Sequence, residues 1–182
     1  MISIFEKQRD LARYAGPGRW NDPDMMEVGN GGMTTEEYKT HFSLWCMLAA
    51  PLMAGNDLRS LTPETKLVLL NKEIIALDQD SLGRQAVIYR DNGDYQIWIK
   101  MLSKNEKAVC LLNKSDEKKS VLVDFALLFQ VNRSRRDGSG SNKLEDYRIR
   151  DLWDHKDLSL KESSVYIDMM PHSVKVYRYI RK

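Results

Sequence analysis

Helical spacing of apolar residues is clearest after Thr34. Apolar side chains recur every three or four positions there, which predicts an amphipathic helix with Tyr38, Phe42, Trp45, Cys46 and Ala49 on its apolar face. Thr34 and Glu37 have the spacing of a capping box, in which each side chain bonds the other residue's backbone N–H. Pro51 ends the pattern, because proline cannot continue a helix.

The remainder of the first 83 residues alternates loops, apolar segments and helical patterns. Residues 4–14 are compatible with a helix or its tail, and residues 15–24 have loop composition. Short apolar segments at 25–28 and 51–54 predict buried strands, each ended by glycine. A second helix is predicted to begin with Thr62 as N-cap and Pro63, to end before Gly83, and to present Leu67, Leu70, Ile74 and Ile75 on its apolar face. This order is typical of βα units that build a parallel sheet.

From Arg84 onward the pattern changes to short strands separated by polar turns. Strands are predicted at residues 86–89, 95–99, 108–112, 120–125, 147–153, 164–167 and 173–179. The Asn-Gly pair within Asp91–Asp94 predicts a hairpin, and the polar segment Asn113–Lys119 predicts another. We therefore expect an α/β unit over residues 1–83 and an antiparallel β-sandwich over residues 84–182.

Charge supports this division without indicating a charged partner. The 182 residues include 28 basic and 26 acidic side chains, a formal net charge of +2. Residues 1–83 carry 8 basic and 12 acidic side chains, and residues 84–182 carry 20 and 14. Nothing in this balance favours nucleic acid or an anionic membrane, and we interpret the basic segment 133–142 as a solvated loop. The longest apolar stretch, 44–55, is too short to span a bilayer.

Length and cysteine content exclude several classes of protein. A complete (β/α)₈ barrel needs about 250 residues, more than this sequence holds. Cys46 and Cys110 lie far apart and form no CxxC pair, which excludes zinc ribbons, c-type haem sites and disulfide scaffolds. We expect Cys46 to be a buried free thiol. The histidines at 41, 155 and 172 suggest no Ser/His/Asp grouping.

The segment Trp20–Met25 is the densest candidate site. Asp22 and Asp24 lie two residues apart beside an indole, and carboxylates with an aromatic face are suited to sugar chemistry. The same composition also fits a structural loop closed by an Asx-turn. A metal at the two aspartates lacks the further ligands that a calcium loop supplies, so no metal or cofactor is expected.

Several motifs resemble glycoside hydrolase family 27, the clan-D α-galactosidases. That family shows G-P-G-x-W-N-D-P-D-M-L-x-V-G-N, then a helix T-x-x-E-x-x-x-H-F-x-L-W, then A-P-L and N-D-L-R. This sequence has Gly16–Asn30, Thr34–Trp45, Ala50–Leu52 and Asn56–Arg59 at the corresponding positions. Asn71–Gly83 is also similar to the family, and Met26 stands where leucine is usual.

The resemblance implies a barrel followed by an antiparallel β-domain. Residues 1–83 would be the last two βα units of a (β/α)₈ barrel, and residues 84–182 the C-terminal β-sandwich. In the family, a retaining α-galactosidase removes terminal α-linked galactose from oligosaccharides or glycoconjugates. Its nucleophile and acid/base lie in K-Y-D and R-x-x-x-D motifs, neither of which occurs in residues 1–83. We therefore expect both catalytic aspartates upstream and no activity from this chain alone.

For the residues present, the resemblance implies roles around the sugar. Asp24 and Met25 would contact substrate, while Trp20, Asn21 and Asp22 would hold the loop. The expected partners are an α-galactoside and either the missing N-terminal barrel segment or a second copy of the chain. An extracellular, periplasmic or lysosomal location is implied by the family, although no signal peptide is visible.

Two other functions stay open at this stage. An α-N-acetylgalactosaminidase of the same family would have the same motifs, because the residues that contact the 2-substituent are supplied upstream in relatives. A non-catalytic carbohydrate-binding module would bind galactose without hydrolysing it, but no aromatic platform pattern in residues 84–182 favours it.

Overall fold

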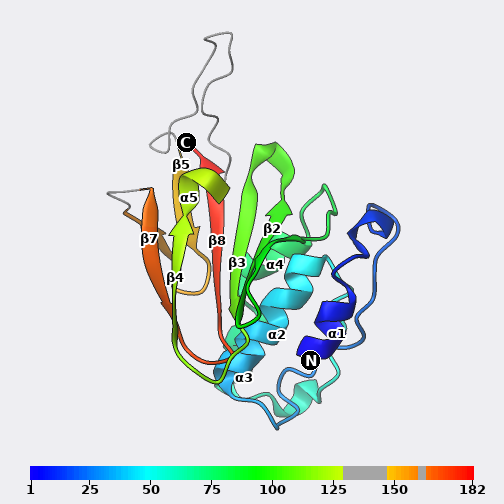
Figure 1. Ribbon diagram of the computed structural model, residues 1–182. Coiled ribbons are helices and arrows are strands. Elements are labelled where there is room, and N and C mark those ends of the chain that lie inside the picture. Colours follow the sequence, from blue (N-terminus) through cyan, green and yellow to red (C-terminus); the bar gives the residue numbers. More distant parts are fainter. Residues whose placement is uncertain (129–146, 160–162) are drawn as a thin grey trace.

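A computed structural model describes residues 1–128, 147–159 and 163–182, so the basic segment 133–142 lies outside the described residues. The elements form three layers: a two-stranded sheet, a six-stranded sheet and a group of helices (Figure 1). The helices are α1 (Ile2–Lys7), α2 (Thr35–Leu48), α3 (Pro63–Leu69), α4 (Lys72–Asp78) and α5 (Phe125–Leu128). The strands are β1 (Val87–Asp91), β2 (Tyr95–Met101), β3 (Lys107–Asn113), β4 (Lys119–Asp124), β5 (Tyr147–Asp151), β6 (Lys156–Leu158), β7 (Ser164–Met169) and β8 (Val174–Arg181).

Strand pairing is antiparallel in both sheets. The larger sheet has the order β1-β2-β3-β8-β5-β6, and the smaller one pairs β4 with β7. The predicted hairpin around Asn92-Gly93 is confirmed as β1 and β2. The hairpin predicted between residues 108–112 and 120–125 is wrong, because β3 pairs with β2 and β8 while the chain crosses to the other sheet before β4. Strand β6 was not predicted.

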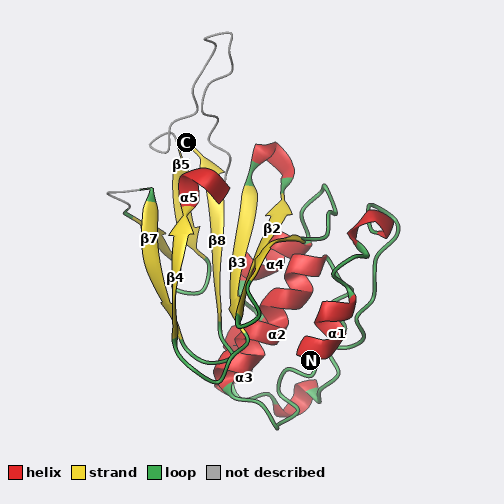
Figure 2. Cartoon of the chain, in the orientation of Figure 1, coloured by secondary structure: helices red, strands yellow, loops and turns green. Residues whose placement is uncertain are grey.

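The apolar side chains on both faces of β3 explain why the larger sheet is the middle layer (Figure 2). Ala108, Cys110 and Leu112 are buried on the helical side, in the core shared with α2. Val109 and Leu111 are buried on the opposite side, against β4 and β7. A strand with both faces apolar is stable only between two layers, so its sequence fixes its central place.

Helix α2 forms as its sequence pattern predicts. The Thr34 hydroxyl accepts from the Glu37 backbone N–H at 3.2 Å, and the Glu37 carboxylate accepts from the Thr34 N–H at 2.7 Å, which confirms the capping box. Ala49 takes a left-handed conformation with φ 55° and ends the helix two residues before Pro51. Cys46 is confirmed as a buried free thiol within α2.

The second helix is interrupted, contrary to prediction. Asn71 separates α3 from α4 by accepting hydrogen bonds from the backbone N–H groups of Glu73 and Ile74 at 3.0 and 3.1 Å. Its amide also donates to the Leu152 carbonyl at 3.0 Å, which ties the break to the sheet. Leu67 and Leu70 are therefore exposed instead of forming one apolar face with the buried Ile74.

The two strands predicted before and after α2 are reduced to one parallel bridge between Met26 and Ala54. The Met26 N–H donates to the Met53 carbonyl at 2.8 Å, and the Gly55 N–H donates to the Met26 carbonyl at 2.9 Å. Their parallel direction agrees with the prediction. Among the described residues no third strand pairs with either segment, so the ladder does not extend.

A buried lysine connects the sheet to the end of α2. Lys100 of β2 is fully buried, and its Nζ donates to the carbonyls of Cys46 and Met47 at 2.9 and 3.3 Å. A cation at a helix C-terminus is favourable because the last carbonyls have no partner inside the helix. Burial lowers the pKa of Lys100 to about 8, which leaves it charged at neutral pH.

The helical part and the sheet share one hydrophobic core, which includes Trp45 from α2 and Trp98 from β2. The domain boundary between residues 83 and 84 therefore stays a prediction. Within the described ranges, no helix is both long and apolar enough to cross a membrane.

We predict that Lys100→Met lowers the free energy of unfolding by about 1–3 kcal/mol, because two buried carbonyls lose their donor. Burial raises the pKa of Asp78 to about 6, while the nearby Lys100 charge opposes that shift. Asp78 is ionised in the folded state at pH 7.5 and neutral at pH 5. The decrease in the free energy of unfolding, measured by urea denaturation, should therefore be larger at pH 7.5, where the substitution also removes a cation near the ionised Asp78.

The control is the same substitution in an Asp78→Asn background, where the loss should be equal at the two pH values. If the free energy lost in Lys100→Met alone did not change between pH 5 and pH 7.5, that result would contradict the electrostatic interaction of Lys100 with Asp78.

Candidate functional site

The Asp22–Asp24 loop is closed by its own side chains. The Asp24 N–H donates to the Asp22 carboxylate at 2.9 Å, which forms an Asx-turn across the buried Pro23. The Met25 N–H in turn donates to Oδ1 of Asp24 at 2.7 Å. Asp24 is exposed, and its Oδ2 has no protein partner within the described residues. The Asp22 carboxylate thus accepts a hydrogen bond within the loop, whereas one carboxylate oxygen of Asp24 stays open to solvent.

A second contact fixes the backbone of Asp24 against α2. Asp24 has φ 77°, in the left-handed region that non-glycine residues seldom adopt. Its carbonyl accepts a hydrogen bond from the indole Nε1 of Trp45 at 2.8 Å. The residue is therefore held at its N–H, at its carbonyl and through one carboxylate oxygen.

Asp24 and the half-exposed Met25 line a cavity of about 150 Å³. The remaining lining residues come from the N-terminus, α1, the segment before α2, and α2 itself, namely Met1, Ile4, Glu27, Met33, His41 and Trp45. The cavity joins exposed carboxylate to apolar side chains, the combination that binds the polar and apolar faces of a sugar ring.

His41 is a buried residue in the lining of this cavity. Its ring packs against Trp45 with the ring centroids 4.1 Å apart, and 1% of the residue is exposed. Burial, together with a smaller effect of the charged N-terminal amine, lowers the pKa of His41 to about 4, so the ring is neutral at neutral pH. Neither ring nitrogen has a partner among the described residues.

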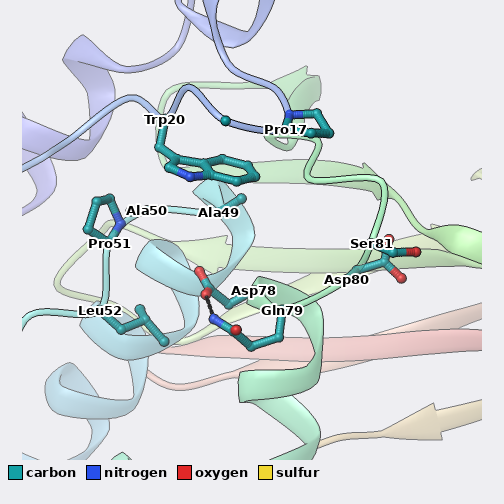
Figure 3. Close-up of a pocket in the computed structure, with 11 residues that line it drawn as sticks. Pro17, Trp20, Ala49, Ala50, Pro51, Leu52, Asp78, Gln79, Asp80 and Ser81 are labelled. Atoms are coloured by element: carbon teal, nitrogen blue, oxygen red, sulfur yellow. Dashed lines mark hydrogen bonds between the residues drawn. The ribbon is translucent and has the colours of Figure 1, made fainter.

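Trp20 lies in a different cavity. That cavity has a volume of about 480 Å³. Figure 3 shows the Trp20 indole on one side of it, with Asp78 and Gln79 on the other side. The Gln79 amide donates to the Asp78 carboxylate there at 2.5 Å. The two cavities share no lining residue, so the indole beside Asp24 is that of Trp45.

Asn21 joins the loop to two distant segments. Its amide donates to the Leu11 carbonyl at 2.7 Å and to the Gln85 side chain at 2.8 Å. Gln85 donates in turn to the Gln8 carbonyl at 2.7 Å. These hydrogen bonds fix Asn21, the residue before the Asp22–Asp24 loop, to the N-terminal segment on one side and to the residues before β1 on the other.

The two loop aspartates are not arranged as a catalytic pair. Asp22 lines neither cavity, and its Oδ1 is engaged by the Asp24 N–H. Within the described parts of the chain, no three His, Cys, Asp or Glu side chains come together as a possible metal site.

Sequence reasoning missed Trp45 and His41 as parts of this site. Their four-residue spacing predicts that they lie on one face of α2. It does not predict that this face contacts Asp24, which precedes Trp45 by 21 residues. Only the fold brings the indole to that carbonyl.

Comparison with known proteins covers nearly the whole chain. Residues 2–80 match the family described as "Alpha galactosidase A", and residues 92–179 match "Alpha galactosidase C-terminal beta sandwich domain". The chain is 42% identical to "Alpha-galactosidase A" of Cellvibrio japonicus over 98% of its own length and 43% of that protein. It is 40% identical to "Alpha-galactosidase 2" of Arabidopsis thaliana over 100% of its own length and 43% of that protein.

A solved structure gives the same result for the fold. The chain superimposes on α-galactosidase I from Mortierella vinacea with a TM-score of 0.87 at 33% identity, covering 100% of this chain and 44% of that one. The matches place the chain among the glycoside hydrolases. It belongs to glycoside hydrolase family 27, the α-galactosidases, and corresponds to their C-terminal portion.

The partial barrel followed by a β-sandwich is therefore confirmed. The chain spans about two fifths of the length of the curated relatives it matches.

We predict that Gly55→Ala destabilises the segment that carries Met25. An alanine Cβ at this position would lie 2.9 Å from the Met26 carbonyl oxygen and 3.4 Å from Met25 Cβ, so the bridge between the two segments must shift. We expect a loss of about 1–3 kcal/mol in the free energy of unfolding, measured by urea denaturation.

Gly16→Ala is the matched control, because a Cβ there meets nothing closer than 3.9 Å and neither glycine has a left-handed backbone. Its cost should stay within about 0.5 kcal/mol. Equal costs for the two substitutions would show that the approach of Gly55 to Met26 is not a tight constraint.

Proposed function

We propose that this chain is the C-terminal part of an α-galactosidase that hydrolyses terminal α-linked galactose from oligosaccharides or glycoconjugates. In this proposal Asp24 and Met25 form one wall of the galactose pocket, and Trp20, Asn21 and Asp22 support the loop. The observation that carries it is the match of both halves of the chain to α-galactosidase families in the order that those enzymes have.

The chemistry at Asp24 and Met25 supports their role. The free Oδ2 of Asp24 is an exposed anionic acceptor for sugar hydroxyl groups, and a hydrogen bond to a charged group is worth about 1.5–3 kcal/mol. Met25 is 51% exposed and offers an adaptable apolar surface to the C–H face of a sugar. Together they recognise a hydroxylated ring, but neither supplies a proton or forms a bond to it.

A retaining mechanism requires two carboxyl groups about 5 Å apart, one to protonate the leaving oxygen and one to form the glycosyl-enzyme. The two acidic side chains nearest Asp24 are engaged locally: Asp22 accepts from the Asp24 N–H, and Glu27 accepts from the Asn30 amide at 2.5 Å. We propose that the nucleophile and the acid/base come from polypeptide N-terminal to this chain, since its relatives are more than twice as long.

The other two functions receive no support from the comparisons. The curated relatives are named as α-galactosidases, which favours neither an α-N-acetylgalactosaminidase nor a non-catalytic binding module.

The first test is hydrolysis of an aryl α-galactoside by the 182-residue chain and by a completed enzyme. The completed enzyme joins this chain to the N-terminal part of the Mortierella vinacea relative, replacing the 44% of that protein that the chain matches. We expect no turnover from the chain alone and clear turnover from the chimera. Turnover by the chain alone, or a folded chimera without turnover, would contradict the proposal.

A second test concerns the sugar contact. In the chimera, Asp24→Asn should lower kcat/KM by about 10- to 100-fold, because the substrate hydroxyl loses a charged acceptor while the turn to Met25 keeps its amide oxygen. Asp22→Asn is the control: asparagine also closes an Asx-turn, so kcat/KM should change by less than about threefold. Equal effects of the two substitutions on kcat/KM would contradict a direct contact between Asp24 and the sugar.

A further inference from the structure

The backbone of Asp24 is strained, and its neighbours maintain that strain. A left-handed conformation costs a non-glycine residue about 1–2 kcal/mol, and Asp24 adopts it with φ 77°. Such strain persists only where surrounding contacts impose it. Two of those contacts are local, from Asp22 and Met25, and depend on the loop itself. The third comes from α2.

Trp45 supplies that third contact from a rigid position. Its indole is 1% exposed and lies within a stretch of α2, Thr40–Leu48, in which every residue is buried. His41, one turn earlier on α2, packs against the indole with centroids 4.1 Å apart. Since the indole has one N–H and no acceptor, its hydrogen bond to the Asp24 carbonyl at 2.8 Å fixes a single arrangement of the two groups.

We propose that Trp45 is a positioning residue for sugar binding: its indole N–H holds the Asp24 carbonyl so that the left-handed backbone presents Oδ2 to the substrate. The proposal rests on the proposed function. His41 supports the indole by packing and remains neutral, so no charge competes with the hydrogen bond. The helix thus holds the backbone of a residue whose other two hydrogen bonds are local.

The matched control for this role is Trp98. It is fully buried, and its indole N–H also makes one hydrogen bond, to the Gln96 side chain at 3.0 Å. It lines neither of the two cavities. Trp45→Phe and Trp98→Phe both keep an aromatic ring and lose one buried N–H, so a purely structural effect should be similar in both.

The first arm of the test uses the 182-residue chain and needs no activity. A crystal structure of the Trp45→Phe chain should show Asp24 outside the left-handed region, whereas the Trp98→Phe chain should keep its φ near 77°. An unchanged Asp24 backbone in the Trp45→Phe chain would overturn the proposal, whatever the chimera does.

The second arm measures kinetics in the chimera, at a temperature where every variant is folded. Trp45→Phe should lower kcat/KM about tenfold or more, because small displacements of a binding group are costly, and Trp98→Phe should change it by less than twofold. In an Asp24→Asn background, Trp45→Phe should add less than about a twofold effect, since the group it positions has lost its charge.

Independent, multiplicative effects of Trp45→Phe and Asp24→Asn would assign Trp45 to general stability and overturn the proposal. A chimera that is inactive with the unaltered chain would count against the proposed function alone, because the crystal structures still decide whether Trp45 holds the Asp24 backbone.

Discussion

Burial of helix α2 between the loop segments and the six-stranded sheet is the constraint on which the rest of the structure depends. A helix that is buried along nine consecutive residues cannot rotate or slide without opening the core on several sides. The carbonyl of Cys46 in its last turn accepts a hydrogen bond from Lys100 of β2, and the indole of Trp45 in the same turn donates to the Asp24 carbonyl. The sheet and the candidate site are therefore positioned by one element.

This arrangement gives the β-sandwich a role in a site that it does not line. The apolar inner face of the larger sheet supports α2, and α2 holds the backbone of Asp24, the exposed loop residue with the strained conformation. Neither cavity beside the loop is lined by residues of the β-strands. The two halves of the chain match separate sequence families, but their buried residues form one shared hydrophobic core.

Much of this fold could be predicted from local sequence. The capping box at Thr34 and the Asn-Gly hairpin between β1 and β2 were both predicted from short sequence motifs and are confirmed. Two predictions were wrong because the structure there depends on residues far away in the sequence. Asn71 interrupts the second helix and bonds the Leu152 carbonyl, and β4 pairs with β7 instead of with β3. Asp24 and Met25 became candidates through family resemblance, whereas the bond from Trp45 depends on packing that no spacing rule encodes.

The central claim is that Asp24 belongs to the sugar-binding wall and that the reacting carboxyl groups come from elsewhere. A crystal structure of the completed enzyme with galactose bound tests it most directly. The account predicts Oδ2 of Asp24 within hydrogen-bond distance of a sugar hydroxyl, and two other carboxyl groups, both from the N-terminal part, beside the anomeric carbon. Galactose held without Asp24, or with Asp22 and Asp24 on either side of its anomeric carbon, would contradict it.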